Sequence, residues 1–294
     1  MNNIKIVKLK RVMSDEQGEQ LKGQFLDESY IKHPIINEDC DGYDTNGNLL
    51  FRFRKNIIPI EILKQGVENF EYSIELTDGR GITSGSSHKR VRKDGSVSKI
   101  TVGNKVLSGN VGYMDANAMI PYCRMTAFGR NHFDKFQEGI PFVEHISELY
   151  KELCPEHYTI QKKYCVATNQ SYIIGNSAFT TVTVNKNFRT ALHKDSGDLS
   201  KGFGNLIAYR EGDWSGSYFI LPEFGVGIDL HNGDCLFVDV HRWHCNTEYI
   251  NFNPENGDKR ISFVMYYREQ MISCNSPSNE LAIIKKEKNG YYRL

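Results

Sequence analysis

The architecture of this 294-residue chain can be inferred outward from one stretch, Thr180-Thr-Val-Thr-Val-Asn-Lys-Asn-Phe-Arg-Thr-Ala-Leu-His-Lys-Asp195. Its β-branched run from Thr180 to Val184 predicts a strand. A short turn follows and presents His193 and Asp195. A His-x-Asp pair just past a strand end offers two of the three ligands of a 2-His-1-carboxylate facial triad, which binds Fe(II) and leaves three coordination positions open. So short a motif is weak evidence for a metal site by itself, and the rest of the chain has to supply the third ligand and a cosubstrate anchor.

Composition limits the classes of protein to consider. Lys+Arg and Asp+Glu number 36 each, so the net charge of zero produces no global field toward nucleic acid or a membrane, and such binding needs a local patch. Seven cysteines without a Cys-x-x-Cys pair argue against a disulfide framework or a zinc ribbon, and for a reducing compartment. The chain start lacks a signal-peptide core, and no apolar run nears membrane-spanning length. We therefore expect a soluble intracellular protein, cytoplasmic or, in a eukaryote, nuclear, with no membrane partner.

The first 130 residues predict an elaboration outside the catalytic core. Residues 1–35 suggest a strand and a helix, and Leu49–Arg54 a half-buried strand after a turn. Pro59 opens a predicted helix whose apolar positions share one face; they are Ile60, Leu63, Val67 and Phe70. Beyond this region, 131–153 predicts two helical pieces joined at Gly139-Ile-Pro141.

Residues 84–105 form a basic tract, which we expect to be a flexible loop. Six Lys and Arg residues stand there against Asp94 alone, a local excess of five positive charges. Four of the cations are close together: Lys89, Arg90, Arg92 and Lys93. Mobile cations of this kind can contact nucleic-acid phosphates, and an ordinary solvated loop is the alternative.

After Pro155 the pattern indicates short strands separated by Gly, Asn and Asp turns. The predicted strands are 158–165, 172–174, 180–184, 204–209, 217–221, 225–230, 235–240 and 260–267. Such spacing is typical of an all-β sandwich or jelly roll. We therefore predict an α+β chain whose core, 155–270, is a double-stranded β-helix (jelly roll). With the N-terminal helical and strand elaboration, 1–294 forms a single domain.

The strand 235–240 leads to His241-Arg-Trp-His244, where the third metal ligand is expected. We prefer His244, because a ligand normally follows a strand by a few residues, and His241 is the alternative. Farther on, Arg260 could clamp the distal carboxylate of 2-oxoglutarate bidentately, while Ser262 on the same face adds a hydroxyl. Asn185, at the end of the organising strand, could contact cosubstrate or base.

In this order of residues, the region from Ser177 to Arg268 resembles the Fe(II)/2-oxoglutarate dioxygenases. More narrowly it is similar to the TET/JBP group, which oxidises 5-methyl groups of DNA pyrimidines. The resemblance is carried by Phe179–Asp198, Gly212-Asp-Trp-Ser-Gly216 and His244-Cys-Asn-Thr247. It implies that His193, Asp195 and His244 bind iron, that Arg260 binds 2-oxoglutarate and that O2 is the oxidant. The long DNA-recognition insertions of some relatives are missing.

The function expected from this resemblance is hydroxylation of the 5-methyl group of 5-methylcytosine or thymine in DNA. A methyl group in the major groove cannot reach a buried iron, so the base would have to be flipped out. DNA is the expected partner, and no obligate protein partner is inferred. Two alternatives stay open: a hydroxylase of a free amino acid, small metabolite or protein side chain, and a cupin-like binding module without turnover.

Overall fold

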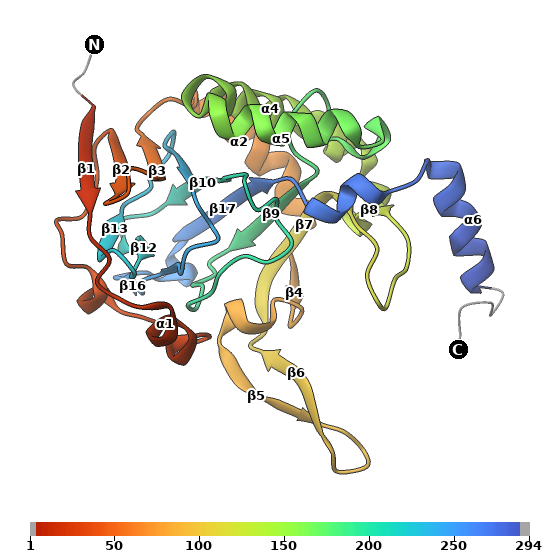
Figure 1. The fold of residues 1–294 in the computed structure, drawn as a ribbon, viewed down its shortest axis with the longest axis horizontal. Helices are drawn as coiled ribbons and strands as arrows, with labels where there is room; N and C mark the ends of the chain where they lie inside the picture. The colour runs from red at the N-terminus through yellow and green to blue at the C-terminus, as the bar shows by residue number, and fades with distance from the viewer. Residues whose placement is uncertain (1–3, 289–294) are drawn as a thin grey trace.

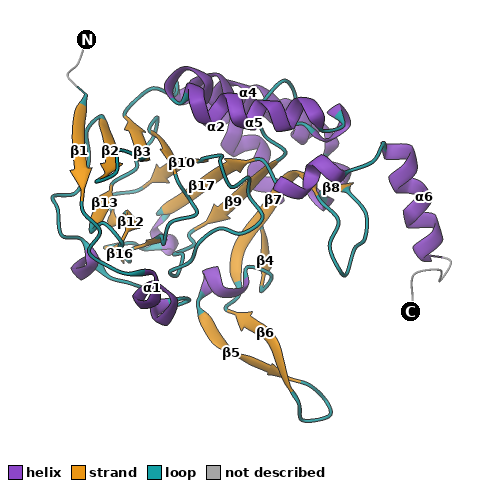
Figure 2. Ribbon diagram, in the orientation of Figure 1, coloured by secondary structure: helices purple, strands orange, loops and turns teal. Residues whose placement is uncertain are grey.

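The computed structural model describes residues 4–288, with only the backbone described at 86–91, 98–102 and 287–288. A ten-stranded sheet forms its body in the order β1-β2-β3-β14-β10-β17-β9-β7-β4, and β8 pairs with β7 (Figures 1 and 2). Only the β1–β2 pair among these is parallel. The strands are β1 Lys5–Leu9, β2 Cys40–Asp44, β3 Leu49–Arg54, β4 Glu75–Thr77, β7 Val106–Met114, β8 Arg124–Met125, β9 Thr181–Lys186, β10 Gly204–Glu211, β14 Cys235–Val238 and β17 Lys259–Tyr266.

Smaller sheets complete the β-structure. One has the order β13-β12-β15, and β11 pairs with β16. Their strands are β11 Ser215–Gly216, β12 Phe219–Leu221, β13 Val226–Ile228, β15 Cys245–Asn246 and β16 Tyr249–Ile250. The predicted jelly-roll core with helical and strand additions is confirmed, and its N-terminal strands extend the main sheet on both sides.

Helices α2 (Ile60–Phe70), α4 (Phe133–Leu153) and α5 (Pro155–Ala167) cover one face of the main sheet (Figure 1). The α-helices are α1 Asp15–Leu21, α2 Ile60–Phe70, α3 Ala127–Asn131, α4 Phe133–Leu153, α5 Pro155–Ala167 and α6 Pro277–Lys288. Short 3-10 helices span Glu28–Tyr30, Glu71–Ser73, Gly81–Ser84, Gln170–Tyr172, Pro254–Asn256 and Glu269–Ser273. The ring of Phe142 on α4 lies 5.1 Å from that of Phe263 on β17 and 6.4 Å from that of Phe70 on α2. These contacts form the core between the helical layer and the sheet.

Three local predictions are wrong. Residues 158–165 belong to helix α5, whose first residue is Pro155, and 172–174 form no strand, since Tyr172 ends the 3-10 helix Gln170–Tyr172. The predicted break at Pro141 is absent, since α4 is one helix with Pro141 inside it. Packing overrides the proline there, because the neighbouring Gly139 lies against the Phe70 ring of α2. On α2, Leu63, Val67 and Phe70 are buried as predicted, but Ile60 is 46% exposed.

The basic tract is a hairpin and not the loop expected from its composition. Strands β5 (Ser86–Val91) and β6 (Val97–Gly103) pair antiparallel and project away from the body of the molecule (Figure 1). The tip turns at Gly95, whose φ of 81° is readily adopted by glycine. At its base, the Asn104 amide donates to the Ser84 carbonyl at 2.8 Å. The sequence shows the turn residues at the tip, and the β-branched residues on either side of it favour strands over a loop.

The cysteines include one bonded pair, a single disulfide and not the framework that the sequence argues against. Cys123 and Cys274 are joined across a sequence separation of 151 residues. The other five cysteines are free and buried. Such a distant pair leaves no local spacing signal in the sequence.

None of the helices within residues 4–288 has the length and apolarity needed to cross a membrane.

Candidate active site

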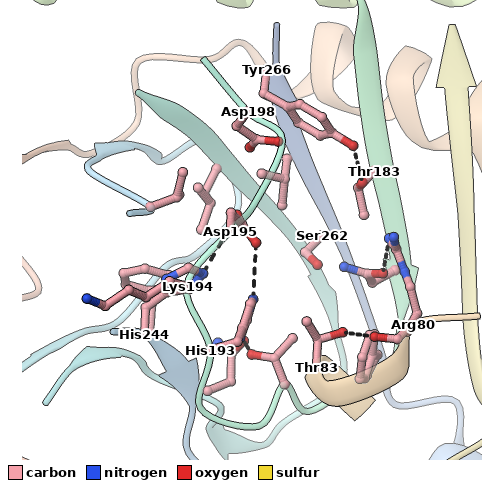
Figure 3. Close-up of a pocket in the computed structure, with 18 of the residues that line it drawn as sticks. Arg80, Thr83, Thr183, His193, Lys194, Asp195, Asp198, His244, Ser262 and Tyr266 are labelled. Carbon is pink, nitrogen blue, oxygen red and sulfur yellow. Dashed lines mark hydrogen bonds and ion pairs between the residues drawn. The ribbon is translucent and has the colours of Figure 1, made fainter. Parts of the chain in front are cut away.

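A pocket of about 310 Å³ lies between the main sheet and the smaller β13-β12-β15 sheet. Strands β9, β10 and β17 supply one wall and the region of β12 and β15 the other. Figure 3 shows the side chains that converge on it. Most residues predicted as site residues line this pocket: Asn185, His193, Asp195, His244, Arg260 and Ser262.

His193, Asp195 and His244 form a cluster at one side of the pocket. Their candidate ligand atoms all lie within 4.8 Å of one another. Nε2 of His193 is 3.3 Å from Oδ1 of Asp195, and Nε2 of His244 is 3.8 Å from Oδ2. Both histidines are buried. One metal ion could therefore contact two imidazoles and one carboxylate from a single side.

Each histidine ring is oriented by a backbone carbonyl. Nδ1 of His193 lies 2.7 Å from the Ala191 oxygen, and Nδ1 of His244 lies 2.9 Å from the Arg242 oxygen. A carbonyl can only accept, so both Nδ1 atoms carry the proton and donate it. The Nε2 lone pairs consequently face the cluster, the tautomer that a metal-binding histidine needs. Burial lowers the pKa of His244 to about 4, so this ring is neutral and able to bind a metal at neutral pH.

The donor set fits Fe(II). Two neutral imidazoles and one carboxylate match the facial arrangement, and the pocket leaves space on the other side for further ligands. With both imidazoles protonated, the His193 hydrogen bond and the charges of the two histidines outweigh burial and hold the pKa of Asp195 at about 2, so the carboxylate is ionised at neutral pH.

Arg260 provides a second functional group of the pocket. Its side chain is on β17, and the residue is only 7% exposed. Among the residues that the structure describes, none forms an ion pair or hydrogen bond with its guanidinium, and only its backbone N–H donates, to Asn187 Oδ1 at 2.8 Å. A buried guanidinium without a partner is costly unless an anion joins it. Ser262, two residues along, lines the same pocket and can donate a hydroxyl to that anion.

Arg80 is a pocket residue that the sequence analysis missed. It precedes the 3-10 turn Gly81–Ser84 and reaches across toward β9 (Figure 3). Its Nε donates to Ser108 Oγ at 2.6 Å, and its Nη2 donates to Asn185 Oδ1 at 3.3 Å. Asn185, predicted to contact cosubstrate or base, thus uses its amide oxygen to hold Arg80. Both partners are neutral, and burial lowers the pKa of Arg80. A lone Gly-Arg-Gly offers no spacing that would have revealed this.

Thr183, Asp198 and Tyr266 lie together at another part of the pocket (Figure 3), which Arg268 also lines. The hydroxyls of Tyr266 and Thr183 are 3.1 Å apart, and Nε of Arg268 donates to Asp115 at 2.6 Å. Burial and the nearby Asp195 carboxylate raise the pKa of Asp198 well above its usual range. This part of the pocket therefore mixes hydrogen-bond donors and acceptors in a confined space.

Among the remaining predicted residues, His241, Arg92 and Lys93 do not line the pocket. The His241 ring is directed to Asp239, with Nδ1 3.2 Å from Oδ1, and His241 does not line the pocket. Arg92 and Lys93 are exposed at the hairpin tip. Lys89 and Arg90 are on β5, and their side chains lie outside the part of the chain that the structure describes.

Comparisons with known proteins agree with this geometry. The family Tet_JBP, described as the oxygenase domain of the 2OGFeDO superfamily, matches residues 111–269. Thymine dioxygenase JBP1 of Trypanosoma brucei brucei is 29% identical over 256 residues, which are 86% of this chain and 29% of that protein. The bifunctional helicase and thymine dioxygenase JBP2 of Leishmania tarentolae is 36% identical over 168 residues, 56% of this chain and 15% of that protein. The chain thus spans less than a third of the length of either relative.

A solved structure is similar over nearly the whole chain. NgTET1 in complex with 5mC DNA superposes with a TM-score of 0.59 at 16% identity, covering 97% of this chain and 91% of that chain. At this identity the likeness concerns the fold. The family match shows membership of a family and not the fold alone, because it spans more than half of the sequence and includes His193, Asp195, His244 and Arg260. The chain belongs to the Tet/JBP oxygenase domain family of the 2OGFeDO superfamily, whose members use Fe(II) and 2-oxoglutarate.

Proposed function

We propose that the chain is an Fe(II)- and 2-oxoglutarate-dependent dioxygenase that hydroxylates the 5-methyl group of a pyrimidine, 5-methylcytosine or thymine, in DNA. One observation carries the proposal: a His193–Asp195–His244 cluster shares a buried pocket with the unpartnered guanidinium of Arg260. A metal site alone would suit many reactions. A metal site beside a buried cation suits a metal-chelating cosubstrate that also carries a distal carboxylate.

The roles follow from the positions of the side chains. His193, Asp195 and His244 would hold Fe(II), and Arg260 with Ser262 would hold the distal carboxylate of 2-oxoglutarate. When bound, the metal and cosubstrate supply the O2-dependent oxidation of an unactivated C–H bond. The chain itself orients the cosubstrate and confines the methyl group, so no nucleophile or general base is required.

Arg80 adds a second positive charge to the pocket. Ser108 and Asn185 orient its guanidinium without neutralising it. We assign it to the second carboxylate of the cosubstrate, because Arg80 lines the same pocket as the ligand cluster and Arg260. Two arginines would then face the two ends of one dicarboxylate, and each would gain the counter-charge it lacks in the protein.

DNA as the substrate is supported by the names of the relatives and by the basic hairpin. The two relatives are thymine dioxygenases, and the structural neighbour was solved with 5mC DNA. The hairpin carries a local positive excess in a chain of zero net charge. Its base adjoins the pocket, since Arg80 and Thr83 line it. Because the metal cluster is buried, a base in duplex DNA would need to flip out to reach it.

The test is mass spectrometry of nucleosides from DNA incubated with the protein, Fe(II), 2-oxoglutarate and O2. We expect a hydroxymethyl pyrimidine and succinate, both absent with His193→Ala. If succinate forms without any change in DNA, the enzyme class stands and the substrate is wrong. The zero net charge favours one alternative, a hydroxylase of a free small molecule, amino acid or protein side chain. Absence of succinate with every substrate would instead indicate a cupin-like binding module.

A further inference from the structure

The N-terminal helix α1 packs against the turns that carry the three candidate metal ligands. Its first residue, Asp15, is 179 positions from Lys194 and 228 from Trp243 in the sequence, yet its side chain bonds to both. Lys194 separates His193 from Asp195, and Trp243 immediately precedes His244. The segment around α1 lies outside the region 111–269 that matches the family.

A single oxygen atom connects the two ligand-bearing turns. Oδ1 of Asp15 accepts from Nζ of Lys194 at 2.7 Å and from the indole Nε1 of Trp243 at 3.1 Å. The Lys194 ammonium also lies over the Trp243 ring, 4.9 Å from its centroid. The hydrogen bond from Lys194 keeps the pKa of Asp15 below its usual range. Asp15 is therefore a charged acceptor shared by both turns.

A second carboxylate fixes the backbone of the same tryptophan. Glu223 is fully buried, and its Oε1 accepts from the Trp243 backbone N–H at 2.7 Å. Its other oxygen accepts from Arg11, at 3.0 Å for Nε, and Nη2 of Arg11 also lies 3.3 Å from Asp15. Arg11 thus joins the two carboxylates, and the indole and amide of Trp243 are each held by one of them.

Backbone pairing and apolar packing hold the segment in place. Gly23 N–H donates to the Leu192 carbonyl, and Leu192 N–H donates to the Gln24 carbonyl, both at 2.8 Å. A buried cluster joins residues of this segment to neighbours of the ligands, and it contains Met13, Leu26, Leu192, Ile220, Trp243 and Cys245. At Gly18 a methyl group would lie 2.2 Å from Nε1 of Trp243, so the helix contacts the indole directly.

We propose that Asp15 is a positioning residue of the metal site, which acts through Lys194 and Trp243 to hold the two ligand-bearing turns at the spacing that His193, Asp195 and His244 require. The inference rests on the proposed metal role of those three residues. Asp15 is 54% exposed at its side chain, and exposed ion pairs add little to folding stability. Its main effect is therefore expected on site geometry, to which metal affinity is sensitive.

The experiment compares Asp15→Ala with Glu19→Ala, a matched control on the same helix. Glu19 pairs only with Lys22 among the described residues, at 2.9 Å. Co(II) serves as the probe, since its visible d–d absorption reports both binding and coordination geometry without turnover. We expect the Co(II) dissociation constant to rise about tenfold in Asp15→Ala, with an altered spectrum, as for other residues that orient ligands. In Glu19→Ala both should match wild type, and the metal-free proteins should unfold at similar temperatures.

Two further variants make the result specific. Asp15→Asn keeps an acceptor for Trp243 but loses the ion pair with Lys194, so it should fall between wild type and Asp15→Ala. Adding Lys194→Ala to Asp15→Ala should weaken Co(II) binding little further, because both remove the same link. Equal Co(II) affinities and spectra in Asp15→Ala and Glu19→Ala would overturn the proposal. If instead His193→Ala binds Co(II) as tightly as wild type, the metal site itself is misassigned and the proposed function fails.

Discussion

His193 and His244 exchange two backbone hydrogen bonds. The N–H of His193 donates to the His244 carbonyl at 3.1 Å, and the N–H of His244 donates to the His193 carbonyl at 2.9 Å. The two imidazoles consequently project from paired backbone positions and lie side by side, with ring centroids 4.2 Å apart. Main-chain pairing thus brings the two ligand-bearing turns together, and it persists when either side chain is removed.

This pairing predicts the outcome of substitutions at the cluster. His193→Ala, Asp195→Ala and His244→Ala should each abolish metal-dependent 2-oxoglutarate turnover, because two ligands bind the metal far more weakly than three. Circular dichroism and the thermal unfolding of the metal-free protein should change little. His241→Ala is the control, since its ring faces Asp239. An inactive His241→Ala beside an active His244→Ala would reverse the assignment.

Arg260→Lys tests the cosubstrate anchor. Lysine keeps the charge but loses the planar fork, so the 2-oxoglutarate affinity should fall by roughly 10- to 100-fold, the equivalent of about 1.5–3 kcal/mol for charged hydrogen bonds. Metal binding should be preserved, because Arg260 is not among the clustered ligands. Isothermal titration with 2-oxoglutarate in the presence of metal measures the change. An unaltered affinity would move the anchor to another arginine of the pocket, Arg268 or Arg80.

The ligand cluster was predictable because its signals are local and ordered. His-x-Asp after a β-branched strand, a histidine a few residues after strand 235–240, and Arg-x-Ser at the start of the last strand can each be seen in the sequence. Asp15 and Arg80 could not be found this way. Each reaches the site through tertiary packing from a distant segment, and an isolated aspartate or a Gly-Arg-Gly carries no periodicity or spacing.

The secondary-structure prediction was wrong where tertiary packing determines the structure. The segment Tyr158–Cys165 is rich in aromatic and β-branched residues, which favour a strand. It nevertheless forms helix α5, because Pro155 starts a helix and Gln161 and Cys165, four residues apart, face the core. The long strands β9, β10 and β17 were predicted correctly, since their apolar runs end at clear turn residues.

His157 predicts a pH dependence of stability. Its ring lies half-buried 3.8 Å from the Phe203 ring, and burial lowers its pKa below 6.5, although Glu156 and Asp239 oppose this. As the pH falls below about 6.5, the unfolded chain takes up a proton more readily than the folded one, so the free energy of unfolding decreases. His157→Gln should remove this part of the decrease between pH 7 and pH 5 in urea titrations. The exposed His33→Gln is the control, and identical slopes in the two variants would contradict the prediction.

The hairpin cations provide the test of DNA contact. We expect Gln substitutions at four positions to weaken DNA binding and to leave DNA-independent 2-oxoglutarate turnover unchanged. The four positions are Lys89, Arg90, Arg92 and Lys93. Each lost phosphate contact should reduce the slope of log affinity against log salt by about one unit. The loss should be nearly uniform across DNA sequences, because phosphate contacts position the strand without reading it.

A matched pair separates a local contact from a change in total charge. Arg92→Gln with Lys93→Gln removes two exposed cations at the hairpin tip, and Lys64→Gln with Lys163→Gln removes two exposed cations from helices α2 and α5 across the molecule (Figure 1). If the hairpin clamps DNA, only the first pair lowers the salt slope, since exposed charges farther apart than a Debye length of about 8 Å are largely screened at physiological salt. Equal effects of the two pairs would mean that net charge alone governs DNA affinity. If the quadruple variant keeps the wild-type slope of log affinity against log salt, the hairpin is an ordinary solvated element. If the wild-type protein does not bind DNA, the substrate is instead a small molecule or a protein.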